Sequence, residues 1–230
     1  WLKAFGVKNE KGYVSELANS MFTKGGWDEF LENPGSLWIW QYHLVNLGRA
    51  SIYQLFFKEF RKQQRRNQFT KTQLEQFLKR KSEGKVADKT LKNDIKVFIK
   101  MYLVEDKMGK GVEDDLSSMF IELNLISEVD ASEKEITYQL RVDMKKEIPS
   151  PIFLYCILDS FPERESISMD EIIDEVGDAL VCTNEGVERH VGKLCELYPQ
   201  QVVFKEDAGR KEVQIDAGLD KWEELTKYYN

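Results

Sequence analysis

The sequence predicts a mainly α-helical protein with tandem winged-helix (helix-turn-helix) subdomains that carry small β-hairpin wings. Two helix-turn-helix patterns support this fold, one in each of the later two thirds of the chain. Each pattern is followed by two short segments of alternating polarity, as expected for a hairpin. A length of 230 residues allows two or three small subdomains, and we divide the chain into 1–66, 67–148 and 149–230.

The N-terminal subdomain, 1–66, is predicted to be helical and truncated at its start. The opening WLKAFG has no initiator methionine and is typical of the end of a helix that stops at Gly6. A dense apolar and aromatic stretch follows, with a break at Gly48. It predicts two packed helices, 37–47 and 49–64.

The first winged-helix pattern opens at Thr70, a good N-cap for a helix with one apolar face. The turn KSEGK separates it from a second helix over 86–103, for which Asp88 is the natural N-cap. The N-terminal part of such a second helix is the part that enters the DNA major groove. The wing is expected from 125–129 and 136–142, which DASEKE joins.

The second winged-helix pattern begins after the boundary at Pro149-Ser150-Pro151 and is the clearer of the two. Its expected elements are helices at 152–161, from Ser168, and at 185–198 with Thr183 or Asn184 as N-cap, hairpin strands at 201–205 and 212–215, and a closing helix at 222–229.

Charge is distributed unevenly along the chain. The formal net charge is -7, yet the segment from Lys58 to Lys100 holds fourteen Lys and Arg against five Asp and Glu. The local balance is therefore +9, and the remainder of the chain carries -16. Because salt screens each charge beyond roughly 10 Å, the local excess matters more than the total. This pattern predicts double-stranded DNA as a partner.

Two groups of residues are the candidate DNA contacts. They are Arg61, Lys62, Arg65 and Arg66 in the basic run, and Lys89, Thr90, Lys92, Asn93 and Lys96 in the second helix. Such side chains neutralise phosphates or reach base edges. The basic run is also compatible with a solvated helix end, and winged helices also serve as protein–protein modules. The second subdomain is less basic, so docking of a partner or a homodimer is as good an interpretation there as DNA contact.

No catalytic or metal-binding residue can be assigned from the sequence, and no cofactor is evident. His43 and His190 belong to no metal motif, and no phosphate-binding glycine loop occurs. DNA cleavage with Mg²⁺ or Mn²⁺ would need clustered carboxylates. The acids of 170–178 suit a helix start, Glu113-Asp114-Asp115 is a slightly better candidate in a long loop, and Asp143-Met144-Lys145 is too short to be diagnostic.

Cysteine usage and hydropathy indicate a cytoplasmic protein without a membrane partner. Cys156, Cys182 and Cys195 are odd in number and lack CxxC spacing, so free thiols in a reducing compartment are expected. No apolar run approaches the roughly 20 residues that span a bilayer.

Several stretches together carry a resemblance to a known family. They are WLKAFGV, LENPGSLWIWQYHLVNLGRASIYQLFFKEF, FTKTQLEQFLKR, TLKNDIKVFIKMYL, FIELNLI, IPSPIFLYCILDSF and VVFKEDAGRKEVQI. In this respect almost the whole chain resembles the "domain of unknown function 4007" family. The family occurs in bacterial DNA phosphorothioation and phage-defence clusters, beside sulfur-activating enzymes. One member type nicks one DNA strand so that sulfur can be inserted.

The resemblance implies a DNA-binding role in phage defence, with other phosphorothioation proteins as partners and strand nicking as an activity. No catalytic residue can be carried over from the family. Two further hypotheses stay open. The chain is either an adaptor that docks sulfur-transfer enzymes through its acidic surface, or a transcriptional regulator.

Overall fold

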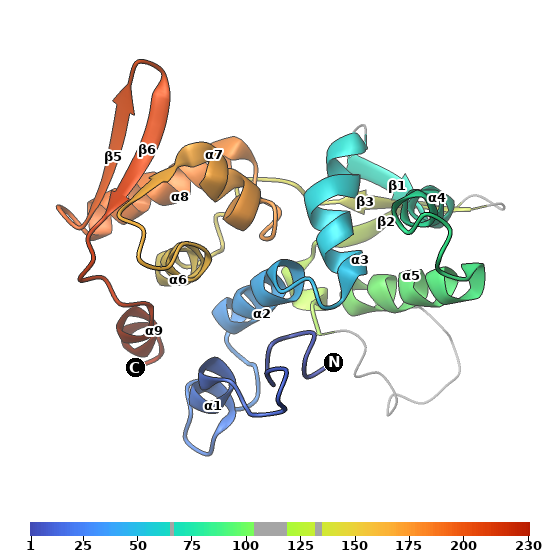
Figure 1. Ribbon diagram of the computed structural model, residues 1–230, viewed down its shortest axis with the longest axis horizontal. Helices are drawn as coiled ribbons and strands as arrows, with labels where there is room; N and C mark the ends of the chain where they lie inside the picture. The colour runs from blue at the N-terminus through green and yellow to red at the C-terminus, as the bar shows by residue number, and fades with distance from the viewer. Residues whose placement is uncertain (65–66, 104–118, 132–134) are drawn as a thin grey trace. The chain divides into compact units, whose positions relative to one another are not determined.

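The computed structural model describes residues 1–64, 67–103, 119–131 and 135–230 (Figure 1). The chain divides into two compact units. Unit 1 combines Trp1–Arg49 with Asp143–Asn230, and unit 2 is Ala50–Val142.

Unit 2 contains short helices and one three-stranded antiparallel sheet. Its elements are α3 (Ser51–Gln54), η1 (Leu55–Phe60), η2 (Arg61–Gln63), β1 (Gln68–Thr70), α4 (Lys71–Lys81), α5 (Asp88–Tyr102), η5 (Ile121–Leu123), β2 (Ile126–Ala131) and β3 (Ile136–Leu140). The strand order is β1-β3-β2, and Phe69 of β1 pairs with Tyr138 of β3. The helix predicted over 49–64 is instead an α turn, a π-helix and a 3-10 turn in succession.

A side-chain cap begins α4, whereas α5 begins without one. The Thr70 side chain accepts from the backbone of Gln73, whose own side chain accepts from the Thr70 backbone, which completes a capping box. The predicted cap of α5 was wrong, because Ala87 is the N-cap and Asp88 is already helical. The Asp88 carboxylate binds Lys79 at 2.7 Å instead of the helix backbone.

The core of unit 2 is an aromatic cluster. Phe56 of η1 lies 4.5 Å from Phe98 of α5 and 4.9 Å from Phe69 of β1, measured between ring centroids. All three side chains are at most 2% exposed. This packing joins η1, the sheet and α5, and therefore determines which side of α5 faces solvent.

Unit 1 repeats the same order of elements after an N-terminal helical part. It contains α1 (Glu16–Phe22), α2 (Pro34–Asn46), α6 (Ser150–Ser160), β4 (Ser166–Ser168), α7 (Met169–Ile172), η6 (Ile173–Gly177), α8 (Asn184–Leu197), β5 (Val202–Asp207), β6 (Arg210–Ile215) and α9 (Lys221–Tyr229). The strand order β4-β6-β5 matches that of unit 2. Ser168 and Glu171 form a capping box at α7, and Thr183 is the N-cap of α8.

The chain start consists of turns over residues 2–6. The Phe5 N–H donates to the Trp1 carbonyl with the spacing of an α-helical turn, and Gly6 adopts the positive φ, 76°, of a residue that ends one. A Cβ at Gly6 would lie 2.6 Å from a methyl carbon of the exposed Leu47 side chain, which can move aside, so it is the positive φ that favours glycine there.

Two buried helices, α2 and α6, form the core of unit 1 and carry polar groups into it. His43 Nε2 lies 2.8 Å from the Tyr155 hydroxyl. Tyr42 donates to Asp159, whose carboxylate also accepts from Lys221 of α9 at 2.6 Å. Burial lowers the pKa of His43 to about 4, so this histidine is neutral at pH 7.

The fold is mixed α/β, because two small antiparallel sheets accompany the helices. Among the described residues, none of the helices is long and apolar enough to cross a membrane.

Candidate nucleic-acid interface

Helix α5 presents two chemically different sides. Its buried side is apolar and consists of Leu91, Ile95, Phe98 and Ile99. Asp88 and Asp94 are exposed toward its flanks, and its exposed side carries Lys89, Lys92, Asn93 and Lys96. These four follow i, i+3, i+4, i+7 spacing and therefore form one row along the helix. Thr90 is exposed at the flank of this row, in the first turn. We call Lys89, Lys92, Asn93 and Lys96 the α5 basic row.

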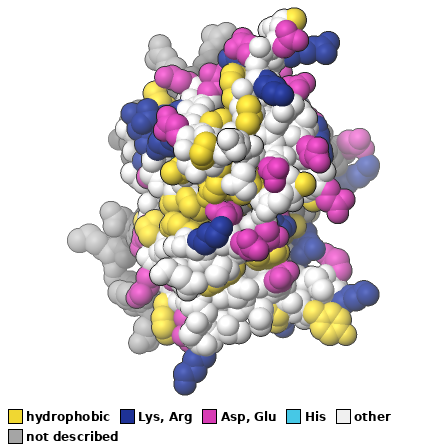
Figure 2. All heavy atoms as spheres, turned by 90° about the vertical axis from the view of Figure 1, so that its left-hand side faces the viewer, with side chains coloured by type: hydrophobic (Ala, Val, Ile, Leu, Met, Phe, Trp, Pro, Cys, Tyr) yellow, Lys and Arg dark blue, Asp and Glu magenta, His cyan; other side chains and the backbone are white. Residues whose placement is uncertain are grey.

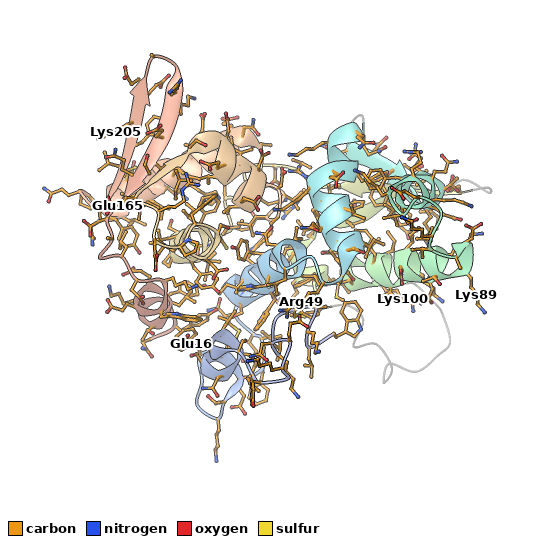
Figure 3. All side chains as sticks on the ribbon, in the orientation of Figure 1. Glu16, Arg49, Lys89, Lys100, Glu165 and Lys205 are labelled. Atoms are coloured by element: carbon orange, nitrogen blue, oxygen red, sulfur yellow. The ribbon has the colours of Figure 1, made fainter. Side chains whose placement is uncertain are left out.

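The cations of the α5 basic row are weakly neutralised. Lys92 Nζ lies 3.8 Å from the Glu75 carboxylate of α4. Within the described part of the chain, Lys89 and Lys96 lie within ion-pair distance of no acidic group. Figure 3 labels Lys89 at the N-terminal end of α5 and Lys100 near its other end. The row therefore presents positive charge to solvent along the first half of α5.

The turn between α4 and α5 is braced by ion pairs. Lys79 at the end of α4 binds Asp88 at the start of α5, which raises the pKa of Lys79 and lowers that of Asp88. Lys81 pairs with Glu59 of η1, and Lys85 with Glu83. These lysines belong to the basic segment by sequence, but acidic groups of unit 2 neutralise their charge.

Arg80 is a candidate contact that the sequence argument missed. It is exposed in the last turn of α4, and no acidic group of the described residues pairs with it. The charge count of the 58–100 segment included Arg80, but only the fold distinguishes it from its paired neighbours Lys79 and Lys81.

The basic run after η1 is only partly described. Arg61 Nε donates to the Phe57 carbonyl at 2.6 Å, which turns part of the guanidinium back onto its own helix. Lys62 is exposed. Arg65 and Arg66, the other two predicted contacts of this run, lie outside the described residues.

The described residues of the hairpin β2–β3 include exposed or half-buried acidic groups. Glu128 is exposed on β2. Glu135, at the start of β3, accepts from the Thr72 backbone at 2.9 Å, and hydrogen bonds from Thr72 lower its pKa. Because carboxylates repel phosphates, α5 is a better anion-binding element than this hairpin.

The equivalent helix in unit 1 has a different surface. α8 exposes Glu185, Glu188, Arg189 and Glu196. Lys211 of β6 pairs with Glu188 at 2.6 Å, so a hairpin cation is used to neutralise the helix. His190 is buried, stacks on Phe153 and lies 2.9 Å from the Lys145 carbonyl. α8 therefore lacks a row of cations like that of α5.

Comparison with known proteins gives the chain a family. The family model described as "Protein of unknown function (DUF4007)" matches residues 1–229. The chain belongs to this family. The resemblance drawn from the sequence is thereby confirmed.

Two crystal structures share the fold of this DUF4007 chain. They are the structure of SspB and that of magnesium ion-bound SspB, with TM-scores of 0.79 and 0.80. Both are 22% identical to this chain, and each comparison covers 100% of this chain and 73% of the SspB chain. At this identity the likeness establishes a common fold. None of the curated proteins matches the chain.

A metal site is not apparent in the described part of this DUF4007 chain. No group of three or more His, Cys, Asp and Glu side chains is placed there to hold an ion. Lys145 is fully buried and lies 3.3 Å from Asp143, so the Asp143-Met144-Lys145 fragment forms an internal ion pair. The acids of 170–178 do not form a shared site, since the Glu171 side chain caps α7 and Asp178 is buried. Glu113-Asp114-Asp115 lies outside the described residues.

The three cysteines are free thiols. Cys156 and Cys182 are buried, and burial raises the pKa of the Cys156 thiol well above its usual range. A buried thiol with a raised pKa is a poor nucleophile, so Cys156 is a packing residue of the unit 1 core.

Proposed function

We propose that this chain is a DNA-binding component of a bacterial DNA phosphorothioation and phage-defence system, and that unit 2 provides the DNA contact. One observation carries the proposal. The α5 basic row places cations in the first turns of an exposed helix, and Lys89 and Lys96 have no acidic partner among the described residues. Phosphates are the groups that such a row neutralises, with release of counterions.

Each repeat of helices and sheet is, in this proposal, a winged helix. The turn between α4 and α5 and the hairpin after α5 occur in the order of a winged helix-turn-helix, with α5 as the recognition helix. α6 to β6 would be the second copy. In the proposed division into 1–66, 67–148 and 149–230, the segment from β1 to β3 of the first copy lies in 67–148, and its helices α3 and η1 lie in 1–66.

The proposed contacts fall into two classes. Asn93 has the amide that pairs with adenine in the major groove, and Thr90 has a hydroxyl for bases or phosphates. The lysines and arginines would contact the backbone, and they are Arg61, Lys62, Arg65, Arg66, Lys89, Lys92 and Lys96, to which we add Arg80.

The salt dependence of duplex binding tests this proposal. Each phosphate contact contributes about 0.9 to the slope of log affinity against log salt. Lys92→Glu and Arg65→Glu should each weaken binding to every duplex and reduce that slope by about 1. Lys205→Glu is a matched control, since Lys205 is exposed on β5 of unit 1 (Figure 3). If neither test variant differs from the control, the basic segment of unit 2 is not the DNA site.

The proposed setting rests on family membership and on the common fold with SspB. Both support a place in DNA phosphorothioation, with other proteins of that system as partners. The free thiols fit the reducing cytoplasm of a bacterial cell.

The magnesium ion-bound neighbour favours a second candidate function, metal-dependent nicking of one DNA strand. Mg²⁺ or Mn²⁺ would stabilise the charge on the leaving and attacking oxygens. Supercoiled plasmid incubated with the protein and either ion should convert to open circle, and EDTA should prevent it. Retention of the supercoiled form with both ions, alongside intact duplex binding, would remove nicking and leave the DNA-binding proposal standing.

A further inference from the structure

Unit 1 contains a groove that the DNA proposal does not use. It lies between the loop from α6 to β4 and the loop from β6 to α9, with a volume of about 330 Å³. Its apolar part includes Leu158, Phe161 and Leu219. We call it the α6/α9 groove. Pockets that bind ligands start at about this size.

Acidic side chains surround the apolar part of the α6/α9 groove. They are Glu163, Glu165, Asp216 and Asp220. The Asp220 carboxylate accepts from the backbone at the start of α9, and the Asp216 carboxylate accepts from the Gly218 backbone, so hydrogen bonds hold both side chains in position. None of these four acids pairs with a cation of the described residues.

Two cations also line the α6/α9 groove, but acids outside it neutralise them. Arg164 forms a two-pronged bond with Glu171, at 2.7 and 3.1 Å. Lys221 binds Asp159 at 2.6 Å and lies over the ring of Trp222. The charge that remains available to a ligand in the groove is therefore negative.

A second hollow adjoins the α6/α9 groove on the same side of unit 1. Glu165, labelled in Figure 3, lies on the side of unit 1 that Figure 2 turns toward the viewer. Figure 2 shows hydrophobic side chains gathered on this face, with both acidic and basic side chains among and around them. The second hollow, of about 370 Å³, shares Glu165, Ile215 and Asp216 with the groove and continues it along β5 and β6.

We propose that the α6/α9 groove is the docking site for a basic, amphipathic helix of a partner protein. Apolar side chains of that helix would fill the groove over the half-buried Leu158 and Leu219, because Phe161 is buried beneath the Arg164 guanidinium, and flanking Lys or Arg would meet the four acids. DNA does not fit, because its phosphates would face the same acids. A second copy of this chain fits poorly, since its basic helix α5 has its apolar side buried in unit 2.

Peptide binding to the full chain tests the proposal. The probe is a short amphipathic helical peptide of leucine and lysine, followed by fluorescence anisotropy, with a leucine–glutamate peptide of the same pattern for comparison. The leucine–lysine peptide should bind, and the double variant Glu163→Lys/Glu165→Lys should weaken it about tenfold or more, which is about 1.4 kcal/mol. Leu219→Ser should weaken it too, without changing the protein's melting temperature by more than a few degrees.

The control variant is Glu206→Lys/Asp207→Lys, at the β5–β6 turn of the same unit. It makes the same charge change on exposed residues outside the groove. Equal binding of the glutamate peptide, or an equal loss in the control variant, would overturn the docking proposal. Duplex binding, measured on the same variants at a salt concentration that screens the added charges, should stay at the wild-type level, so this test is independent of the DNA proposal.

Discussion

The two repeats of this protein share an order of elements but differ in surface and core. The segments are α3 to β3 in unit 2 and α6 to β6 in unit 1. In each, a short strand is followed by two helices and a hairpin, and the short strand and the hairpin form one three-stranded sheet. The exposed side of α5 carries a row of lysines, whereas α8 exposes mainly acids. One arrangement of backbone therefore supports opposite electrostatic surfaces, because the exposed residues contribute little to the core that sets the fold.

The cores of the two repeats differ as well. Unit 2 is packed with phenylalanine rings around Phe56 and Phe98. Unit 1 holds two histidines in its interior, His43 beside Tyr155 and His190 stacked on Phe153. These are the two histidines of the chain, and both belong to unit 1. Protonation of a histidine can therefore disturb the core of unit 1 but not that of unit 2.

The largest expected effect tests the difference in surface. The triple variant Lys89→Glu/Lys92→Glu/Lys96→Glu should lower duplex affinity on the order of 100-fold at moderate salt, because it removes and reverses the whole cation row. Arg189→Glu on α8 is the matched change in the other repeat and should have almost no effect. Electrophoretic mobility shifts at two salt concentrations would measure both. Equal losses of duplex affinity from the α5 and α8 variants would mean that both repeats contact DNA.

The next effect tests the difference in core. Burial lowers the pKa of His43 from 6.5 to about 4, so the unfolded chain binds more protons than the folded chain between these values. The contribution of His43 to the free energy of unfolding is therefore fully present above pH 6.5. It falls as the pH drops toward 4, by up to about 3 kcal/mol. His43→Gln, which keeps a partner for Tyr155, should flatten this dependence.

Tryptophan fluorescence can follow that loss in one unit alone. All 5 tryptophans, at positions 1, 27, 38, 40 and 222, belong to unit 1. Urea unfolding at pH 7 and pH 4.5, read by fluorescence, should show the acid sensitivity of the wild type and its reduction in His43→Gln. An identical pH dependence in both proteins would contradict the assignment to His43.

Caps and periodic helices were predictable from the sequence because their signals are local. Thr70 and Ser168 each hold a capping box with a residue three positions later, and a single window of sequence contains both partners. The three-residue strands β1 and β4 were not predicted, since they exist only through pairing with strands distant in sequence. The same limit explains the wrong cap at Asp88, whose carboxylate is taken by Lys79 of another helix.

The candidate site shows the same division. The excess of Lys and Arg between Lys58 and Lys100 is visible in the sequence, and the apolar periodicity of α5 assigns its exposed side. The sequence could not show which cations are neutralised. Lys79 and Arg80 are adjacent in sequence and carry the same charge, yet only Lys79 forms an ion pair with Asp88 in the folded chain.

A smaller effect compares the two capping boxes directly. Thr70→Ala and Ser168→Ala should each cost about 1 kcal/mol, because each leaves one helix N–H, that of Gln73 or of Glu171, without its acceptor. Ser168→Ala should shift the urea transition seen by tryptophan fluorescence, since α7 belongs to unit 1. Thr70→Ala should appear mainly in circular dichroism, because unit 2 holds no tryptophan. Identical shifts of both variants in fluorescence would mean that the units unfold together.

The smallest expected effect asks whether acids alone keep α8 from contacting DNA. Glu188→Gln removes a carboxylate from α8 and releases Lys211, which it holds at 2.6 Å. Duplex affinity should rise roughly twofold to threefold at low salt and not at all at high salt, because screening removes such exposed interactions. Glu223→Gln on α9 makes the same charge change on another element of unit 1 and should leave affinity unchanged. A gain in both variants would show that net charge, and not the surface of α8, sets the difference between the repeats.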